Sequence, residues 1–141
     1  MPSTRNIEGA VLNTRAQPGS ADESHVLDRV ALDRLRGLGG DQFLAEMVDA
    51  FLPFSEKLMA EARVGLCAGN LVPVVRMGHS LKSSALTFGS EPMRRLAVQI
   101  DECAREGRAE LLPELLAAMD RIYSEVRACL VTVRDNGGKS P

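Results

Sequence analysis

The sequence predicts an all-α protein, an antiparallel four-helix bundle with a short additional N-terminal helix. Apolar residues recur at helical spacing over most of the chain, and no stretch shows the strict alternation of a half-buried strand. Ala, Leu, Arg and Glu are abundant and favour helices, whereas aromatic residues, which favour strands, make up only 4% of the chain. Most glycines fall between the periodic stretches, where helices end.

Length, charge and composition exclude several classes of protein. The 141 residues suit a single domain with its own core, and 17 Lys and Arg against 19 Asp and Glu give a net charge of −2. This balance argues against a nucleic-acid partner, which requires a basic surplus to neutralise phosphates. No apolar run approaches the roughly 18 residues of a membrane span, so no membrane partner is expected. The N-terminus lacks the apolar stretch of a secretory signal, and three widely spaced cysteines fit reduced thiols, so we expect a cytoplasmic protein.

The two ends of the chain differ from its middle. Residues 1–26 show no sustained periodicity and contain scattered Gly, Pro and polar residues, which predicts a flexible N-terminal tail. The helical pattern covers residues 27–134, which we predict to form the bundle. Residues 135–141 are polar and rich in glycine, and we predict that they fray.

The bundle is predicted to begin with a short helix that opens at residues 26–28 and ends in the glycine-rich segment 37–40. Asp41 is a suitable start for a second, longer helix that ends near Gly69. Pro53 lies within the apolar pattern of this helix, and a proline removes one helical hydrogen bond and crowds the preceding turn. We therefore expect a kink at Pro53 rather than two separate helices.

Three further helices complete the pattern. The third is predicted over residues 71–88, with Pro73 tolerated in its first turn. The fourth follows Ser90, a good N-cap, and stops near Gly107. The fifth covers residues 110–134. Four long amphipathic helices joined by short loops bury their apolar stripes best as an antiparallel bundle.

The third predicted helix separates an apolar face from a polar one. At about 100° of rotation per residue, the side chain of His79 points almost directly away from the stripe that is predicted to be buried. That stripe consists of Val74, Met77, Leu81, Ala85 and Phe88. We therefore expect the imidazole of His79 to be exposed.

Two cations and a hydroxyl lie one turn from His79 on the same strip, namely Arg76, Lys82 and Ser83. An exposed neutral imidazole is a nucleophile near neutral pH. Arg76 and Lys82 could neutralise a dianionic group on a ring nitrogen through charge-assisted hydrogen bonds, and Ser83 could donate one more. A surface histidine beside basic residues is usually only solvated, so the spacing is compatible with a phosphohistidine site without establishing one.

Apolar side chains interrupt this polar strip. Val75 and Leu86 would give a partner protein a surface on which to dock, and Ser80 lies next to the histidine in sequence. Met47, on the second predicted helix, is a further candidate for contact with a partner. We predict that these four residues contribute to a docking surface.

Other roles for the histidine find less support in the sequence. Nothing marks the oriented acid or the oxyanion hole of a serine hydrolase, and a hydrolase would need a concave pocket beside His79. Two histidines are too few for a histidine metal cluster, so no metal site is expected. The chain lacks the glycine-rich phosphate loop with which it would bind ATP and phosphorylate its own histidine. A helical adaptor that binds a signalling partner without phosphotransfer remains the alternative.

The segment GHSLKSSALTFG, residues 78–89, resembles the signature of histidine-containing phosphotransfer (Hpt) domains, which reads H-x-L-K-G-S-[SA]-x-x-[LF]-G. Residues 38–44 resemble the start of that family's second helix, and residues 96–107 resemble the helix after the signature. The resemblance extends over residues 27–133. It implies a four-helix bundle with a short N-terminal helix, which carries a phosphoryl group between aspartates of receiver domains in a multistep two-component phosphorelay.

The resemblance also implies roles for single residues. His79 would accept the phosphoryl group, and Lys82 would steady it. Ser83 stands where the family usually has glycine, a small residue that lets the active-site loop of the receiver approach. Some members have a glutamine on the following helix that supports the histidine, and the corresponding position here is Asp101, with Gln99 nearby. An aspartate there could orient the imidazole or could simply be solvated, and the sequence leaves both open.

The expected partners and cofactors follow from the same resemblance. The partners would be receiver domains of response regulators, a hybrid histidine kinase, or both. The partner receiver domain would supply Mg²⁺, so the chain itself would need no cofactor. The protein would act as a phosphoryl carrier without turnover of its own.

Overall fold

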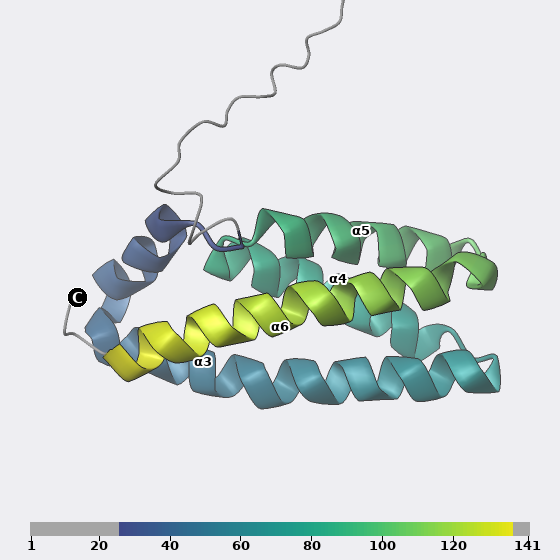
Figure 1. The fold of residues 1–141 in the computed structure, drawn as a ribbon, viewed down its shortest axis with the longest axis horizontal. Coiled ribbons are helices and arrows are strands. Elements are labelled where there is room, and N and C mark those ends of the chain that lie inside the picture. Colours follow the sequence, from purple (N-terminus) through teal and green to yellow (C-terminus); the bar gives the residue numbers. More distant parts are fainter. Residues whose placement is uncertain (1–25, 137–141) are drawn as a thin grey trace, which may run out of the picture.

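The structure, a computed structural model, describes residues 26–136, and all regular structure in that range is helical (Figure 1). The elements are α3 (Arg29–Ala68), α4 (Val72–Phe88), α5 (Glu91–Arg105), the short 3-10 helix η2 (Ala109–Leu111) and α6 (Leu112–Asn136). Helix α4 packs against α3 and α5, and α6 closes the ring by packing against α5 and α3. The predicted all-α four-helix bundle is confirmed.

Gly40 divides α3 into two segments, as the sequence predicts. Its φ of 82° is favourable for glycine, and its ψ of −174° is non-helical. The segment before Gly40 is the short additional helix, which lies at one end of the bundle in Figure 1. Asp28 caps it by accepting a hydrogen bond from the backbone N–H of Val30 at 3.0 Å. The longer segment continues through Pro53 as one helix, as expected, but the kink predicted at Pro53 does not appear in the backbone angles, because within Arg29–Ala68 only Gly40 departs from helical values.

The ends of the described range extend the predicted bundle slightly. The tail predicted over residues 1–26 lies outside the described residues except for Val26, and residues 137–141 lie outside them as well. Val26 and Leu27 are buried and belong to the core. Helix α6 continues to Asn136, two residues beyond the predicted boundary of the bundle.

Glycine and serine mark the turns on either side of α4, the helix that carries His79. Gly69 and Gly89 adopt left-handed φ angles of 75° and 78° and end α3 and α4. Ser90 caps α5 by accepting a hydrogen bond from the backbone N–H of Met93 at 3.3 Å, as predicted. These turns fix where α4 begins and ends, and with it the position of His79.

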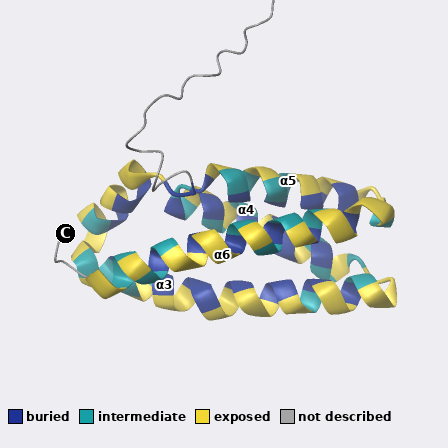
Figure 2. Cartoon of the chain, viewed as in Figure 1, coloured by how far each residue is buried: buried dark blue, intermediate teal, exposed yellow. Residues whose placement is uncertain are grey.

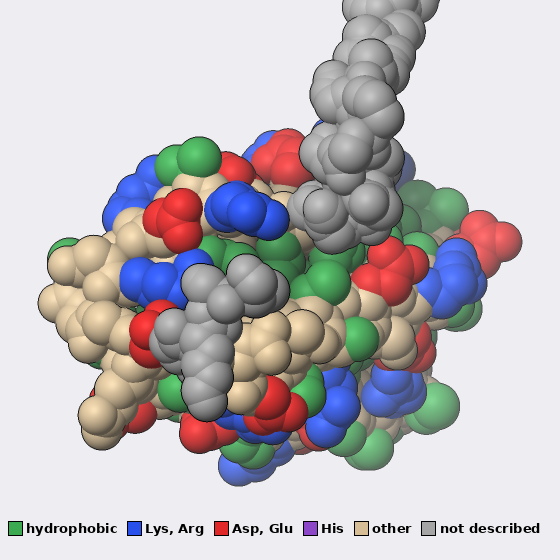
Figure 3. Space-filling model, turned by 60° about the vertical axis from the view of Figure 1, so that its left-hand side comes forward, with side chains coloured by type: hydrophobic (Ala, Val, Ile, Leu, Met, Phe, Trp, Pro, Cys, Tyr) green, Lys and Arg blue, Asp and Glu red, His purple; other side chains and the backbone are tan. Residues whose placement is uncertain are grey.

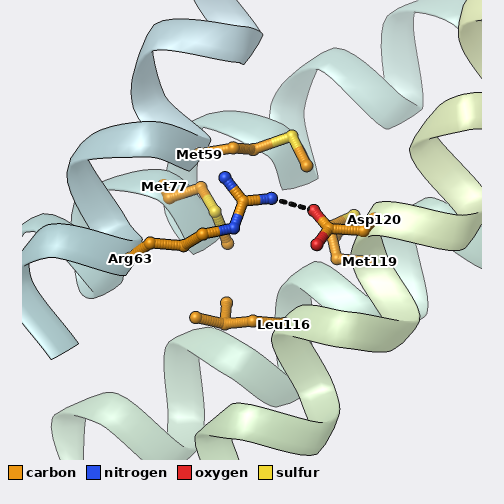
Figure 4. Close-up of a pocket in the computed structure, with 6 residues that line it drawn as sticks. All are labelled: Met59, Arg63, Met77, Leu116, Met119 and Asp120. Carbon is orange, nitrogen blue, oxygen red and sulfur yellow. Dashed lines mark hydrogen bonds and ion pairs between the residues drawn. The ribbon is translucent and has the colours of Figure 1, made fainter. Parts of the chain in front are cut away.

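One continuous core fills the bundle, and Figure 2 shows the buried parts of the helices facing its interior. Near its middle, a hollow between α3, α4 and α6 has no room for a water molecule (Figure 4). The hollow is lined by Met59, Met77, Leu116 and Met119. Arg63 of α3 and Asp120 of α6 form an ion pair at its edge. The ion pair joins these two helices beside an apolar interior.

Charged side chains of both signs lie on the surface. Figure 3 shows basic and acidic residues interspersed on one face of the molecule. Ion pairs between Arg134 and Asp49 at 2.8 Å, and between Arg127 and Glu56 at 3.1 Å, join α6 to α3. No helix within residues 26–136 is long and apolar enough to cross a membrane.

Candidate functional site

Helix α4 has the two faces that its sequence predicts. Its buried residues are Val74, Met77, Gly78, Leu81, Ala85 and Phe88. These are the predicted stripe with the addition of Gly78. His79 is exposed, because about 100° of rotation per residue turns it away from that stripe. The predicted exposure of His79 is therefore confirmed.

The three polar residues predicted around His79 share its side of α4. Arg76 and Ser83 are exposed, and Lys82 is half-buried. Within residues 26–136, the side chains of His79 and of these three neighbours form no hydrogen bond or ion pair. An imidazole, a guanidinium and an ammonium group are thus available to an incoming anion.

The residues predicted to dock a partner are accessible to different degrees. Leu86 is 62% exposed, whereas Val75 and Ser80 are half-buried on the same helix. Met47 lies on α3, where its half-buried side chain packs against the core. Three of the four positions therefore share α4 with His79, and Met47 belongs to a neighbouring helix.

Gly78 brings α5 unusually close to the helix beneath His79. A Cβ atom on Gly78 would lie 2.9 Å from the backbone nitrogen of Asp101 and 3.0 Å from the carbonyl oxygen of Ala97. Such distances are shorter than a side chain tolerates, so only glycine fits without a shift of the backbone. Helical periodicity does not predict this contact. The available signal was a glycine inside a helix, which costs about 1 kcal/mol relative to alanine and therefore indicates a packing requirement.

Asp101 is buried and has a defined partner. The residue is 8% exposed, and its carboxylate accepts a hydrogen bond from Nε of Arg105 at 2.6 Å. Of the two possibilities that the sequence left open, solvation of Asp101 is wrong, because a buried carboxylate paired with arginine is not solvated. Gln99 is exposed.

Neither of the two hollows described for residues 26–136 is lined by His79. The hollow in Figure 4 is lined by four core residues and by the ion pair of Arg63 and Asp120, and a larger groove between α3 and α4 reaches Arg76. Among the residues that the structure describes, no group of three or more His, Cys, Asp or Glu side chains could hold a metal ion. The geometry therefore suits an exposed nucleophile that is approached by another protein.

A family model described as Hpt domain matches residues 46–129, a range that contains His79 and all of α4 and α5. The chain belongs to the Hpt domain family. The match covers more than half of the chain, so membership does not depend on the histidine motif alone. The predicted Hpt resemblance is confirmed, and the protein is a histidine phosphotransfer protein of the phosphorelay type.

A curated relative and a solved structure are similar to this chain, the second in its fold. The phosphorelay protein LuxU of Vibrio vulnificus strain YJ016 is 31% identical over 85 residues, which cover 60% of this chain and 74% of LuxU. LuxU of strain CMCP6 matches equally well. The crystal structure of histidine-containing phosphotransfer protein B (HptB) from Pseudomonas aeruginosa PAO1 has a similar fold, with a TM-score of 0.73 at 24% identity. That likeness covers 78% of this chain and 95% of HptB.

Proposed function

We propose that His79 carries a phosphoryl group between the aspartates of two receiver domains. The observation that carries this proposal is the exposure of His79 on the side of α4 opposite the buried stripe. Membership of the Hpt family and the likeness to a phosphorelay protein support the same chemistry. An exposed histidine on a convex helix can enter the active site of a partner, whereas it cannot enclose a small substrate.

In the proposed reaction, a ring nitrogen of neutral His79 attacks the phosphorus of a receiver's aspartyl phosphate in line. The N–P bond forms with the lone pair of the imidazole as the P–O bond to the aspartate breaks, and the aspartate leaves as a carboxylate. In the second transfer, a carboxylate of another receiver attacks the same phosphorus and His79 leaves. The receiver domain supplies Mg²⁺ and most of the electrostatic stabilisation.

The neighbours of His79 have proposed supporting roles. Lys82 and Arg76 flank the imidazole without a partner among residues 26–136, so both can donate charge-assisted hydrogen bonds to phosphoryl oxygens. Ser83 can donate one more and is small enough for a receiver loop to approach. Leu86 offers an exposed apolar contact, with Val75, Ser80 and Met47 as further docking positions.

The bundle contributes position and exposure rather than turnover. A rigid helix fixes the backbone position of His79 and the direction of its Cα–Cβ bond, which lowers the entropic cost of alignment with the receiver's active site. The chain would therefore act as a carrier without autonomous turnover, in the cytoplasm. Its partners would be receiver domains of response regulators, of a hybrid histidine kinase, or of both.

The test is a phosphotransfer profile. Each receiver domain of the source organism is phosphorylated with radiolabelled acetyl phosphate, freed of excess donor and mixed with the chain. We expect label to move onto the chain within seconds to minutes for one or a few receivers, in an acid-labile bond. His79→Gln should abolish the transfer.

Two outcomes would contradict the proposal. Transfer that persists in His79→Gln would place the acceptor elsewhere. A receiver that binds the chain equally well with and without His79, and never transfers label, would indicate the adaptor alternative.

A further inference from the structure

A groove of about 430 Å³ runs between the last turns of α3 and the first turns of α4. Its α3 wall includes Val64 and Ala68, and its α4 wall includes Pro73 and Arg76. The sequence does not predict this groove, and none of the roles proposed above uses it apart from the charge of Arg76.

Gly65, which lines the groove, lets α3 approach the turn and the first residues of α4 closely. A Cβ atom on Gly65 would be 2.6 Å from the carbonyl oxygen of Asn70 and 2.8 Å from Cγ of Pro73. Asn70 is itself fixed, because its backbone N–H donates to the carbonyl of Gly65 at 2.8 Å and its side chain accepts from the backbone N–H of Val72 at 3.1 Å. The groove is therefore formed by a tightly closed helix–turn–helix and exists before any partner binds.

The lining of the groove suits an apolar side chain next to a charge. The side chain of Val64, which lies within α3, is 70% exposed and gives the groove an apolar wall. Glu61 and Arg76 also line the groove, and neither forms an ion pair within the described part of the chain. Exposed apolar surface bordered by unpaired charges is typical of protein interaction sites.

The position of the groove identifies its occupant. A specific interface covers about 800 Å² on each partner, equivalent to a disc with a radius of about 16 Å. Arg76 and Pro73 precede His79 by three and six residues, which is about 4.5 and 9 Å along the helix at 1.5 Å per residue. A receiver that is centred on His79 therefore covers the groove.

We propose that this groove is the specificity pocket for the receiver domain, and that it takes one apolar side chain of the receiver's docking surface next to the charges of Glu61 and Arg76. This inference rests on the proposed phosphotransfer at His79 and adds how a cognate receiver is selected. Pockets that enclose a single anchor side chain concentrate binding energy, so a mismatch there discriminates between similar partners.

The test compares two substitutions that differ only in place. Val64→Asp puts a charge into the groove wall, and Leu38→Asp puts the same charge at a position that is equally exposed, 71% against 70%. Leu38 precedes the Gly40 kink and lies at the opposite end of α3, outside the receiver's expected footprint. Initial rates of transfer are measured against the concentration of the chain, with the receiver that reacts fastest in the profile.

We expect Val64→Asp to raise the half-saturating concentration at least tenfold with the limiting rate unchanged within twofold, and Leu38→Asp to leave both within twofold. Ala68→Leu, which fills the groove without adding charge, should raise the half-saturating concentration as well. Thermal unfolding followed by circular dichroism verifies that each variant is folded. Equal half-saturating concentrations for Val64→Asp and Leu38→Asp, or tighter binding of Ala68→Leu, would overturn the inference.

A small donor separates this inference from the proposed function. Phosphoramidate transfers its phosphoryl group to an imidazole with loss of ammonia and needs no docking surface. We expect it to label His79 at the same rate in wild type, Val64→Asp and Ala68→Leu.

If wild type accepts label from phosphoramidate but from no receiver, the proposed function fails. If receiver transfer is normal and insensitive to the groove, only the docking inference fails. Sedimentation tests whether a second copy of the chain fills the groove instead. A wild-type dimer that dissociates in the Val64→Asp variant would show this and would also overturn the docking inference.

Discussion

Gly78 and Asp101 are in backbone contact directly beneath the exposed histidine. A Cβ atom added to Gly78 would lie 2.9 Å from the nitrogen and 3.1 Å from the Cα of Asp101. Both neighbours are backbone atoms, which cannot move out of the way by a change of rotamer. The distance between α4 and α5, and with it the position of His79 above α5, is therefore set by the absence of one methyl group.

Gly78→Ala should destabilise the protein even though alanine is the better helix former. Overpacking against backbone costs about 1–3 kcal/mol, and the gain in helix propensity recovers at most about 1 kcal/mol. Gly37→Ala is the matched control, because Gly37 is also helical and has no atom within 4 Å of its added Cβ. We expect it to stabilise by about 0.5–1 kcal/mol. Urea unfolding measures both, and a Gly78→Ala protein more stable than wild type would contradict the contact.

The fold could be predicted because each helix carries its own signals. Periodicity located the apolar stripe of α4 and hence the exposure of His79, and the glycine cluster located the break at Gly40. Ser90 was identified as an N-cap because serine side chains accept from the first free backbone N–H groups of a helix. These features depend on neighbours in sequence, so one chain suffices to predict them.

The features that depend on how helices approach one another could not be predicted. Asp101 is buried because Gly78 lets α5 come close, and it is paired with Arg105 in the same helix. Charged residues are almost always exposed, so the sequence alone does not indicate a buried aspartate. The groove at Gly65 likewise results from the closure of the α3–α4 turn, which a helical wheel of either helix does not contain.

Two leucines of α4 should respond in opposite ways to truncation. Leu81 is fully buried, so Leu81→Ala should lower the free energy of unfolding by about 2–5 kcal/mol. Leu86 is 62% exposed, so Leu86→Ala should change it by no more than about 0.5 kcal/mol but weaken docking of a receiver. Denaturant unfolding and the concentration dependence of phosphotransfer separate the two effects. A large loss of stability in Leu86→Ala would mean that its exposed face is not free to meet a partner.

The loss of folding stability at acid pH should depend in part on Glu91 at the start of α5. Hydrogen bonding to Arg94, aided by Arg95, lowers the pKa of Glu91 from 4.5 to about 2. A carboxylate whose pKa is lower in the folded state stabilises the fold above its unfolded pKa, and this contribution is lost as the pH falls from 4.5 through 2. Glu91→Gln should therefore be less stable than wild type at pH 7, and the difference should shrink towards pH 2. Unfolding measured at several pH values tests this, and a constant difference would contradict it.

Lys82→Gln should slow phosphotransfer without affecting the fold. Lys82 has no hydrogen-bond or ion-pair partner within residues 26–136, so replacing its ammonium group breaks no polar contact of the described structure. A hydrogen bond to a charged group contributes about 1.5–3 kcal/mol, so loss of its contact with the phosphoryl group should lower the limiting rate at least tenfold. Arg121→Gln on α6, an exposed cation remote from α4 in the bundle ring, is the control and should transfer normally. Equal limiting rates in the two variants would remove Lys82 from the site.

The ionisation of Tyr123 should be shifted to higher pH in the folded bundle. Burial raises its pKa to about 12, and its hydroxyl lies 2.9 Å from Oγ of Ser55 and 2.9 Å from a carboxylate oxygen of Glu56. The folded state therefore favours the neutral phenol. This stabilisation is complete below the unfolded pKa of 10.0 and is lost as the pH rises from 10 to 12.

The measurement is clean because Tyr123 is the single tyrosine and the chain has no tryptophan. Absorbance at the phenolate band should titrate near pH 12 in the folded protein and near pH 10 in urea. Tyr123→Phe should lose about 1 kcal/mol of stability at pH 7 through its missing hydrogen bonds. Between pH 10 and 12, the free energy of unfolding should also fall less in Tyr123→Phe than in wild type, because the variant has no phenol to ionise at position 123. A folded protein whose phenol titrates at pH 10 would mean that Tyr123 is solvated, contrary to its contacts with Ser55 and Glu56.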